Sequence, residues 1–414
     1  MIKRSLIVLL VVVALLLTAC APADTTPTSP ATQPTDAPDT TDTPDTPDTP
    51  DTPDEPGDDD GNPNVADYAF DGDPAVVFDI NKWYGDVGVE ANIGIRNPGL
   101  AYVPDIPTTP MPVAKEKYTI GFSVYYTVDE VGAMLLQTMK DAAVEAGVEL
   151  LVNDANYDQA AQNQAIEQWI LQEVDGVILA PCDFTGVKTS LDALEKAGIP
   201  VVSMNAPLAG DADVIVTANT VEQGTIAGDL LEKALLASGV EMKGTIVYQT
   251  LPFVHPNAAT RAKGFVDVFA DYPDINIVEL TGVSPEEHYT AFDGALKAYP
   301  DMIGAWGLYS SATIGMMNAK EANHRDDILL SSVDQDKPIL KGIHDGVVVG
   351  SATYSSMAPA WWCMTAIVNL LNGETVPGVL FYENKSIDKD NVVDMFEYYY
   401  PGKTLQDYLD GKID

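Results

Sequence analysis

Apolar and polar residues follow a regular rhythm along most of the chain. From Lys117 onward, short runs rich in Val and Ile are bounded by turn residues and separated by stretches of about 12 to 18 residues. Within those stretches apolar residues recur at helical spacing, as Ile226, Leu230, Leu231 and Leu235 do. A strand and helix pattern repeated this often predicts parallel sheets with helices on both faces.

The pattern is long enough to require more than one hydrophobic core. About 300 residues exceed what one core usually holds, so we expect two Rossmann-like α/β lobes with parallel sheets; a family resemblance described below implies that a three-strand hinge joins them. Ligands of such sheets bind beyond the carboxyl ends of the strands, so the loops there are the place to look for function. The predicted strands cover residues 118–125, 148–152, 176–180, 200–204, 214–218, 245–249, 275–280, 303–308, 328–333 and 347–354.

The amino terminus has the pattern of an export signal. Lys3 and Arg4 precede twelve uninterrupted apolar residues, 6–17, a run too short to cross the ~30 Å hydrocarbon core of a bilayer. Directly behind it, residues 17–20 (Leu-Thr-Ala-Cys) resemble the lipobox of bacterial lipoproteins. That resemblance implies a signal peptide over 1–19 and a lipid anchor on Cys20.

Residues 21–63 are rich in Thr, Pro and Asp, including four consecutive Thr-Pro-Asp triplets between Thr43 and Asp54. They contain twelve acidic residues and no Lys or Arg, so they cannot form a core. Regular proline favours polyproline II, and this segment could reach up to ~130 Å. We expect residues 20–63 to be the lipidated cysteine and a disordered tether.

Residues 64–115 show no clear periodicity, and we expect an extension of unclear structure there. Asp71, Asp73 and Asp79 suggest calcium coordination, but the segment lacks the glycine and the final glutamate of an EF-hand loop. We therefore expect no metal site.

Composition narrows the choice of partners. The chain has 62 acidic and 22 basic residues, and its net charge of −40 disfavours nucleic acid. A salt-adapted or an acid-tolerant surface could explain the excess, and the sequence does not decide between them. Cys20, Cys182 and Cys363 are too far apart for a short metal or redox motif, and pairing of the last two stays open.

Several ordered motifs resemble the type I periplasmic binding proteins, specifically the sugar-binding lipoproteins of ABC transporters related to ribose- and galactose-binding proteins. The resemblance runs from about Tyr118 to Phe381. It rests on Asp154, Asp158, Gln162, Ile166 and Ile170, then 174–181 (Val-Asp-Gly-Val-Ile-Leu-Ala-Pro) with Asp183, 197–202 (Ala-Gly-Ile-Pro-Val-Val), 226–229 (Ile-Ala-Gly-Asp), Arg261, 264–265 (Gly-Phe), 299–301 (Tyr-Pro-Asp) and 373–374 (Gly-Glu).

The resemblance implies which side chains contact the ligand. Family members close two lobes over a ligand, pair its hydroxyls with Asp, Asn and Arg, and cover its C–H faces with aromatic rings. Polar positions carried over are Asp129, Asn205, Arg261, Tyr309, Asp334 and, near the family's hinge glutamine, Ser355; the aromatic positions best placed to stack are Tyr125, Tyr126, Phe184 and Phe253.

Each position has an ordinary structural alternative. Asp334 could cap a helix, Arg261 could pair on a helix surface, Asn205 could be a turn residue, and the aromatic residues could belong to the core.

Two departures from the family leave the ligand open. Asn205-Ala206 stands where sugar binders commonly have Asp-Arg, and Thr127-Val128-Asp129-Glu130-Val131 replaces an Asn-Pro-Phe-Phe type loop.

The expected function is that of a lipid-anchored extracytoplasmic binding protein. We expect a monomer that binds a monosaccharide or similar polyhydroxylated molecule and delivers it to an ABC permease. Alternatives are a receptor subunit for a sensor kinase or chemoreceptor, or a binder of nucleosides or autoinducer-like furanoses. No nucleophile elbow, phosphate loop or dinucleotide motif is present, so we expect no enzyme activity and no cofactor.

The lobes are expected to interleave along the chain. Residues 116–218 with 356–378 form the predicted first lobe, and residues 219–355 with 379–414 form the second. The predicted hinge crossings lie near Ala218, Ser355 and Val379.

Overall fold

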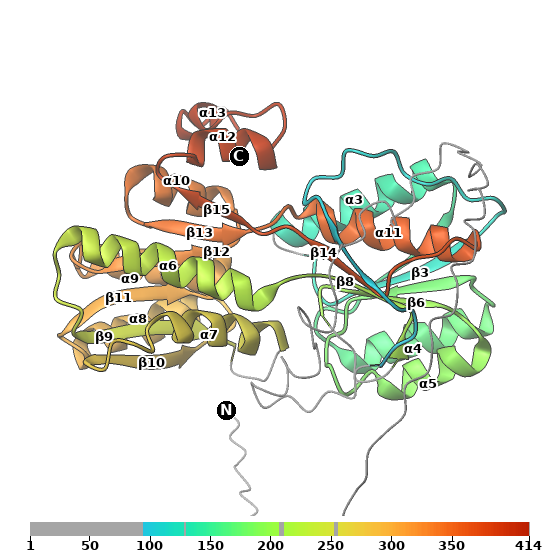
Figure 1. The fold of residues 1–414 in the computed structure, drawn as a ribbon, viewed down its shortest axis with the longest axis horizontal. Helices are drawn as coiled ribbons and strands as arrows, with labels where there is room; N and C mark the ends of the chain where they lie inside the picture. Colours follow the sequence, from blue (N-terminus) through green and yellow to red (C-terminus); the bar gives the residue numbers. More distant parts are fainter. Residues whose placement is uncertain (1–93, 128–129, 207–210, 252–255, 414) are drawn as a thin grey trace, which may run out of the picture. The chain divides into compact units, whose positions relative to one another are not determined.

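The computed structural model describes residues 94–127, 130–206, 211–251 and 256–413. The predicted signal peptide, Cys20, the tether, the acidic residues 71, 73 and 79, and the site candidates Asp129 and Phe253 lie outside these ranges. Within them the chain builds two separate parallel-type sheets with helices on both faces of each (Figure 1), so the predicted α/β class with two lobes is confirmed.

The first lobe contains a seven-stranded, fully parallel sheet. In Figure 1, helices α3 and α11 lie on one face and α4 and α5 on the other, matching two core clusters on opposite faces. The strand order is β2 (Leu100–Val103), β14 (Val379–Tyr382), β8 (Val214–Ala218), β6 (Val201–Met204), β5 (Gly176–Leu179), β3 (Thr119–Val124) and β4 (Glu149–Asp154); the helices are α3 (Glu130–Ala146), α4 (Gln159–Leu171), α5 (Lys188–Ala197) and α11 (Met357–Leu371).

The second lobe contains a six-stranded sheet in which only β15 is antiparallel. Helices α6 and α7 pack on one face, and α8, α9, α10, α12 and α13 contribute to the core on the other. The strand order is β10 (Ile275–Thr281), β9 (Gly244–Thr250), β11 (Met302–Gly307), β12 (Leu329–Val333), β13 (Gly350–Thr353) and β15 (Lys385–Asp388); the helices are α6 (Thr220–Ser238), α7 (Pro256–Val268), α8 (Pro285–Ala298), α9 (Ser310–Ala322), α10 (Lys337–Asp345), α12 (Val392–Tyr399) and α13 (Leu405–Leu409).

Capping residues mark the ends of several of these helices. The Asp158 carboxylate accepts hydrogen bonds from the N–H groups of Ala160 and Ala161 and so caps the start of α4. Gly198 ends α5 in the left-handed region, at φ 72°, and Pro200 then leads into β6. These caps set the positions at which the following strands begin.

Every predicted strand is confirmed, with ends that shift by a few residues, but five further strands of the described residues were missed. Missed strands are β2, β14, β15 and the two-residue pair β1 (Gly94–Ile95) and β7 (Asp211–Ala212). These strands are only two to four residues long, so their periodicity is too short to recognise.

Two predicted lobe boundaries need correction. β14 pairs with β2 and β8 in the first sheet, so residues 379–382 belong to the first lobe and not to the second. The third crossing therefore lies near Glu383, a few residues later than the predicted crossing near Val379. Residues 100–103, assigned to the extension, form an edge strand of the same sheet as β2.

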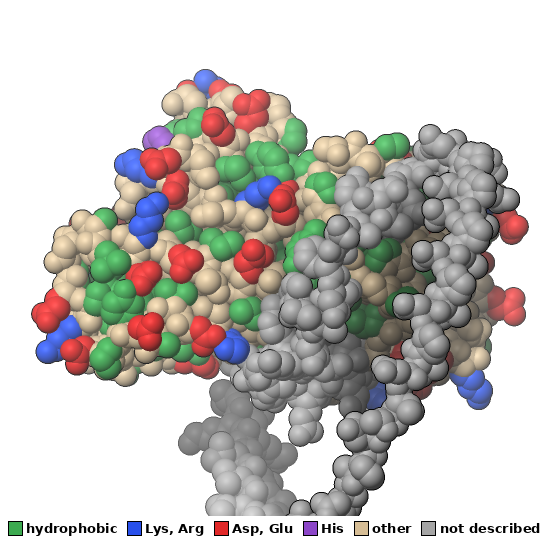
Figure 2. Space-filling view, viewed as in Figure 1, with side chains coloured by type: hydrophobic (Ala, Val, Ile, Leu, Met, Phe, Trp, Pro, Cys, Tyr) green, Lys and Arg blue, Asp and Glu red, His purple; other side chains and the backbone are tan. Residues whose placement is uncertain are grey.

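The surface shows how the acidic excess is distributed. On the visible part of the second lobe in Figure 2, acidic side chains are scattered among polar and apolar groups and interspersed with Lys and Arg. Several acidic residues pair with lysines one helical turn away, as Asp192 does with Lys188 and Asp267 with Lys263. Such exposed pairs each contribute little to stability.

Among the helices that the structure describes, none has both the length and the apolar character that a bilayer crossing requires. The described ranges also contain no cluster of three or more His, Cys, Asp or Glu side chains suited to a metal ion.

Candidate ligand-binding site

Asn205 follows β6 and lies between the two lobes. The residue is buried and adopts a left-handed backbone conformation with φ 63°, one that Asn tolerates better than most residues. Its side-chain Oδ1 accepts a hydrogen bond from the Tyr382 hydroxyl at 2.6 Å. Its backbone carbonyl accepts one from Nδ2 of Asn257, on α7 of the second lobe. Asn205 is thus a contact point between lobes, with its side-chain nitrogen left to donate.

A cavity of about 60 Å³ adjoins Asn205 at the carboxyl end of the first sheet. It is lined by aromatic and polar groups from β3, α3, β6 and the crossing before α11. Among the lining residues are Tyr125, Tyr126, Leu135, Asn205, Tyr354 and Ser356. The lining combines aromatic faces with hydrogen-bonding groups, as ligand sites do, but the volume is well below the roughly 300 to 1,000 Å³ of such sites, so the cavity as it stands is too small for a monosaccharide.

Tyr125 and Tyr126 come directly after β3 and form an aromatic group with Tyr157. The rings of Tyr125 and Tyr157 stack with centroids 5.8 Å apart, and those of Tyr126 and Tyr157 with centroids 5.3 Å apart. The Tyr157 N–H donates to the Tyr125 carbonyl at 2.7 Å, which fixes the two loops together. Both predicted tyrosines therefore line the cavity with their rings already ordered.

Arg261 lies on α7 and is nearly buried. Its Nε donates to Gln223 Oε1 at 2.9 Å, and its Nη1 donates to the Leu308 carbonyl at 3.3 Å. The close approach of α6 and α7 makes this possible, because a Cβ on Gly224 would lie 1.9 Å from the Arg261 carbonyl oxygen. Only glycine fits there, so the sequence positions the guanidinium through backbone packing.

Arg261 also acts on the crossing segment after β13. Burial raises the pKa of the Tyr354 hydroxyl, whereas the positive charge of Arg261 and a hydrogen bond with it lower that pKa. Tyr354 also packs on Tyr382, with ring centroids 4.7 Å apart. Arg261 of the second lobe therefore contacts an aromatic residue that lines the cavity of the first.

Tyr309 follows β11, and its hydroxyl is bonded within the second lobe. It donates to the Gly282 carbonyl at 2.9 Å and lies 2.6 Å from His288 Nε2. Burial lowers the pKa of His288 to about 4, so the imidazole is neutral at physiological pH. The Tyr309 proton goes to Gly282, so His288 carries its own proton on Nε2 and donates to Tyr309.

Asp334 follows β12 in a left-handed conformation, with φ 78°. Its Oδ2 accepts a hydrogen bond from the Ser310 N–H at 3.0 Å. The Ser310 hydroxyl lies 3.3 Å from the same oxygen but donates to Asp336, with which its contact is shorter. Ser310 is the first residue of α9, where a negative charge is favoured by the helix dipole. The carboxylate thus caps the neighbouring helix α9 through Oδ2.

The crossing near Ser355 places a neighbouring serine at the cavity. Ser355 is buried, and its Oγ accepts a hydrogen bond from the Met357 N–H at 3.2 Å at the start of α11. Ser356 lines the cavity instead and accepts a hydrogen bond from Gln335 Nε2 at 2.6 Å. The residue that faces the cavity is therefore Ser356, one position after the predicted Ser355.

Phe184 differs from the other predicted residues. It packs in the core cluster between the first sheet and α4 and α5, with Ile166, Val187 and Leu191 among its members. Its ring is only 9% exposed. Phe184 is therefore a core residue, as its structural alternative expected, and not a ligand contact.

The two described cysteines are both free thiols, so they do not pair. Cys363 is fully buried in α11. Burial, together with the nearby carboxylates of Asp158 and Asp154, raises the pKa of the Cys182 thiol to about 12. Neither thiol has the low pKa that redox or nucleophilic chemistry requires.

Several residues of the site carried no recognisable signal in the sequence. Tyr382 comes from the missed strand β14, and Tyr157 from the loop after β4. Gln223 supports Arg261 across two helices, and Asn257 reaches Asn205 from 52 positions away. Their roles depend on contacts between lobes or helices, which residue type and spacing do not reveal.

Comparisons with known proteins agree with this architecture. A family model described as a periplasmic binding protein domain matches residues 120–375. The xylitol-binding protein of Mycolicibacterium smegmatis is 23% identical over 270 residues, covering 64% of this chain and 76% of that protein. The ribose import binding protein of Bacillus subtilis is 25% identical over 236 residues, covering 56% of this chain and 74% of that protein.

A solved structure of similar fold is an ABC transporter solute binding protein from Mycobacterium smegmatis with bound glycerol. It is 26% identical, with a TM-score of 0.63, and the alignment covers 67% of this chain and 96% of that one. The family match spans more than half of the chain and includes most strands of both sheets, although β2, β14 and β15 lie outside it. This chain therefore belongs to the periplasmic binding protein family, whose members bind solutes and are not enzymes.

Proposed function

We propose that this protein is the extracytoplasmic solute-binding protein of an ABC transporter and that it binds a monosaccharide or polyol for import. The observation that carries the proposal is a set of polar groups around a cavity faced by tyrosines. Asn205 lines this cavity, and Arg261 and the charge of Asp334, both from the second lobe, act on Tyr354, which lines it too. Asn205, Arg261 and Asp334 are all ordered by bonds within the protein, which lowers the entropic cost of binding.

The chemistry of these groups suits a polyhydroxylated ligand. A hydroxyl both donates and accepts, so it can pair with Oδ1 of Asp334 and with the side-chain nitrogen of Asn205. Charge-assisted bonds of this kind are stronger than neutral ones. The ordered rings of Tyr125 and Tyr126 offer apolar faces for the C–H groups of such a molecule.

The named ligands of relatives support the same class. The relatives include proteins named for xylitol, ribose and galactofuranose, and structures of similar fold hold D-allose and myo-inositol. These compounds are alike in carrying several adjacent hydroxyls on a small carbon skeleton. Asn205 is neutral, whereas sugar binders commonly have an acidic residue at this position, so this site has one charge-assisted contact fewer than theirs. This difference favours a ligand that is held through many neutral hydroxyls.

Attachment to the membrane is the second part of the proposal. The apolar run at 6–17 and the small residues before Cys20 support lipidation at that cysteine. The acidic Thr/Pro tether would then allow the lobes to reach a permease at a distance from the bilayer. Radiolabelled palmitate should enter the wild-type protein expressed in a bacterial host and not the Cys20→Ala variant; equal labelling would refute the anchor.

A thermal-shift panel tests the ligand class. The panel includes xylitol, ribose, allose, myo-inositol, galactose and two nucleosides, each at a wide range of concentrations. A ligand present at 100 times its Kd should stabilise the protein by about 2.7 kcal/mol. Stabilisation by nucleosides alone, with no response to any sugar or polyol, would show that the proposed ligand class is wrong.

A further inference from the structure

Residues 96–118, here called the N-terminal strap, precede most of the matched domain and lie along the first lobe. Arg96 Nη1 pairs with Asp213 at 2.9 Å, and Asn97 Nδ2 donates to the Val376 carbonyl at 3.0 Å. Within the strap, β2 adds a strand to the first sheet, and Trp362 Nε1 donates to the Pro104 carbonyl at 2.8 Å. The early part of the strap is therefore fixed to the first lobe.

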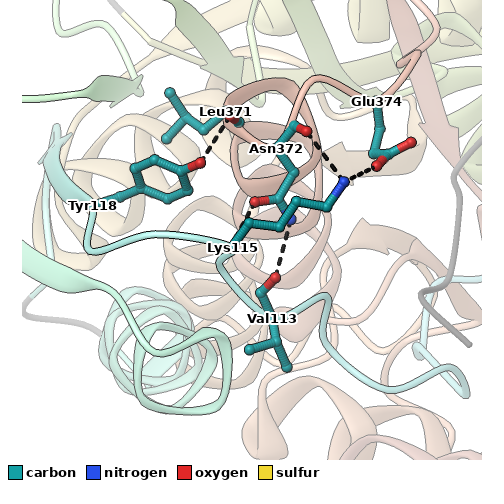
Figure 3. Close-up of polar contacts among 6 residues, drawn as sticks. All are labelled: Val113, Lys115, Tyr118, Leu371, Asn372 and Glu374. Atoms are coloured by element: carbon teal, nitrogen blue, oxygen red, sulfur yellow. Dashed lines mark hydrogen bonds and ion pairs between the residues drawn. The ribbon is translucent and has the colours of Figure 1, made fainter. Parts of the chain in front are cut away.

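The later part of the strap is bonded to the carboxyl end of α11 (Figure 3). Lys115 Nζ lies 2.6 Å from Glu374 Oε1 and donates to the Asn372 carbonyl at 3.3 Å. The Tyr118 hydroxyl donates to the Leu371 carbonyl at 2.9 Å. The last carbonyls of a helix lack donors within the helix, so the strap satisfies them. Both parts of the strap thus belong to the first lobe.

Between these two attachments, Asp105 contacts the second lobe. Its carboxylate is 0% exposed. The Tyr398 hydroxyl donates to Oδ1, and the Tyr399 hydroxyl donates to Oδ2 at 3.3 Å. Both tyrosines lie on α12, whose Phe396 and Tyr399 are part of the core on the second sheet. The adjacent crossing is close by, since the Glu383 N–H donates to the Val103 carbonyl at 3.2 Å.

We infer that Asp105 is a positioning residue that ties α12 to the first lobe and stabilises the arrangement in which Asn257 donates to the Asn205 carbonyl. Within the described residues, three chain crossings connect the lobes covalently, and each can absorb motion by backbone rotation. The bonds to Asp105 form only when α12 lies against the strap, so they favour that one arrangement. The inference concerns the lobes alone and holds whatever the ligand is.

The charges around Asp105 give this contact a pH dependence. Burial raises the pKa of the carboxyl, and Glu383 raises it further, whereas the bonds from Tyr398 and Tyr399 and the charge of Lys385 lower it. Separation from α12 would expose the carboxyl to water and lower its pKa toward the ordinary value. Because the pKa of Asp105 is higher in the tied arrangement, this arrangement binds the proton more tightly. A fall in pH through the raised pKa therefore favours the tied arrangement.

Distances between spin labels on the two lobes test the inference without any ligand. The labels are placed at Val144→Cys on α3 and Leu236→Cys on α6, both exposed, in the full chain with Cys20→Ser and Cys182→Ser. Asp105→Ala and Tyr398→Phe should each lower the ratio of tied to untied molecules about tenfold, as expected for one lost charge-assisted bond. The matched control is Tyr118→Phe, which removes a strap hydroxyl bonded within the first lobe.

The outcomes are distinct. The inference is supported when the two Asp105-contact variants broaden the distance distribution and Tyr118→Phe leaves it unchanged. Unchanged distributions in folded Asp105→Ala and Tyr398→Phe proteins, or equal broadening by Tyr118→Phe, overturn it. Should Asp105→Ala not fold, Tyr398→Phe decides, because that ring stays in place and loses only one hydroxyl.

A pH series on the same labelled protein tests the charge argument. The wild-type distribution should shift toward the tied distance as the pH falls, and Asp105→Asn should stay tied with no such shift. Asn can accept from one tyrosine hydroxyl and donate to the other, but it does not titrate. A wild-type shift toward the untied distance at low pH contradicts the inference.

Discussion

Replacing Asp334 separates its ligand contact from its role at the start of α9. In Asp334→Asn, the remaining carbonyl oxygen can still accept from the Ser310 N–H, and Asn tolerates φ 78°. In Asp334→Ala, that charge-assisted bond is lost, which costs about 1.5 to 3 kcal/mol. Alanine in the left-handed region adds about 1 to 2 kcal/mol.

The two variants should therefore differ in stability and agree in affinity. Asp334→Ala should lose about 2 to 5 kcal/mol of unfolding free energy, and Asp334→Asn much less. Both remove the ionised Oδ1 that we assign to a ligand hydroxyl, so both should weaken binding about tenfold to a hundredfold. The cap and the ligand contact would then be separate functions of the two carboxylate oxygens.

Calorimetry and urea unfolding measure these two quantities on the same preparations. Titration uses the sugar or polyol that gives the largest shift in the thermal panel, and Ser310→Ala is the control. Ser310→Ala keeps the N–H that bonds Asp334 and should change affinity little. If Asp334→Asn binds as tightly as the wild type, Asp334 is a cap alone and our assignment is refuted.

Three further predictions concern described residues. Phe184→Ala should destabilise the fold by about 3 to 5 kcal/mol in urea unfolding, because its ring lies in the core; a loss of affinity with unchanged stability would contradict this. His288, with its pKa lowered from 6.5 to about 4, should contribute roughly 3 kcal/mol of stability that is complete above pH 6.5 and lost as the pH falls toward 4. His288→Gln should remove that part of the pH profile, and an unchanged profile would refute it. Cys182, with its pKa raised to about 12, should react with iodoacetamide about a thousandfold more slowly than a free cysteine at pH 8 by mass spectrometry; fast labelling would refute it.

The sequence by itself determined the elements whose signal is local. The Val- and Ile-rich runs predicted the inner strands of both sheets, because buried parallel strands are apolar throughout. The order of those elements predicted the two-lobed α/β class, and the resemblance to the family singled out Asn205, Arg261 and Asp334, of which Asn205 and Asp334 follow strand ends. The end of α5 is local too, because Gly198 takes the left-handed conformation that caps it.

The missed strands β2 and β14 could not be predicted because their stability comes from their partners. β2 and β14 have four residues each and are placed by pairing with each other across almost 280 positions of sequence. A short strand gains little from its own residues and most from the sheet edge that it covers. Assigning β14 to the wrong lobe followed from that missing information.

The bonding of the site was decided by tertiary structure alone. The sequence named Arg261, yet only the packing of Gly224 against α7 aligns its guanidinium with Gln223 and Leu308. Likewise Tyr382 reaches Asn205 over 177 positions and Tyr398 reaches Asp105 over 293. Hydrogen bonds depend on distance and direction in space, and residues this far apart meet only after the sheets have formed, so no periodicity along the chain records their pairing.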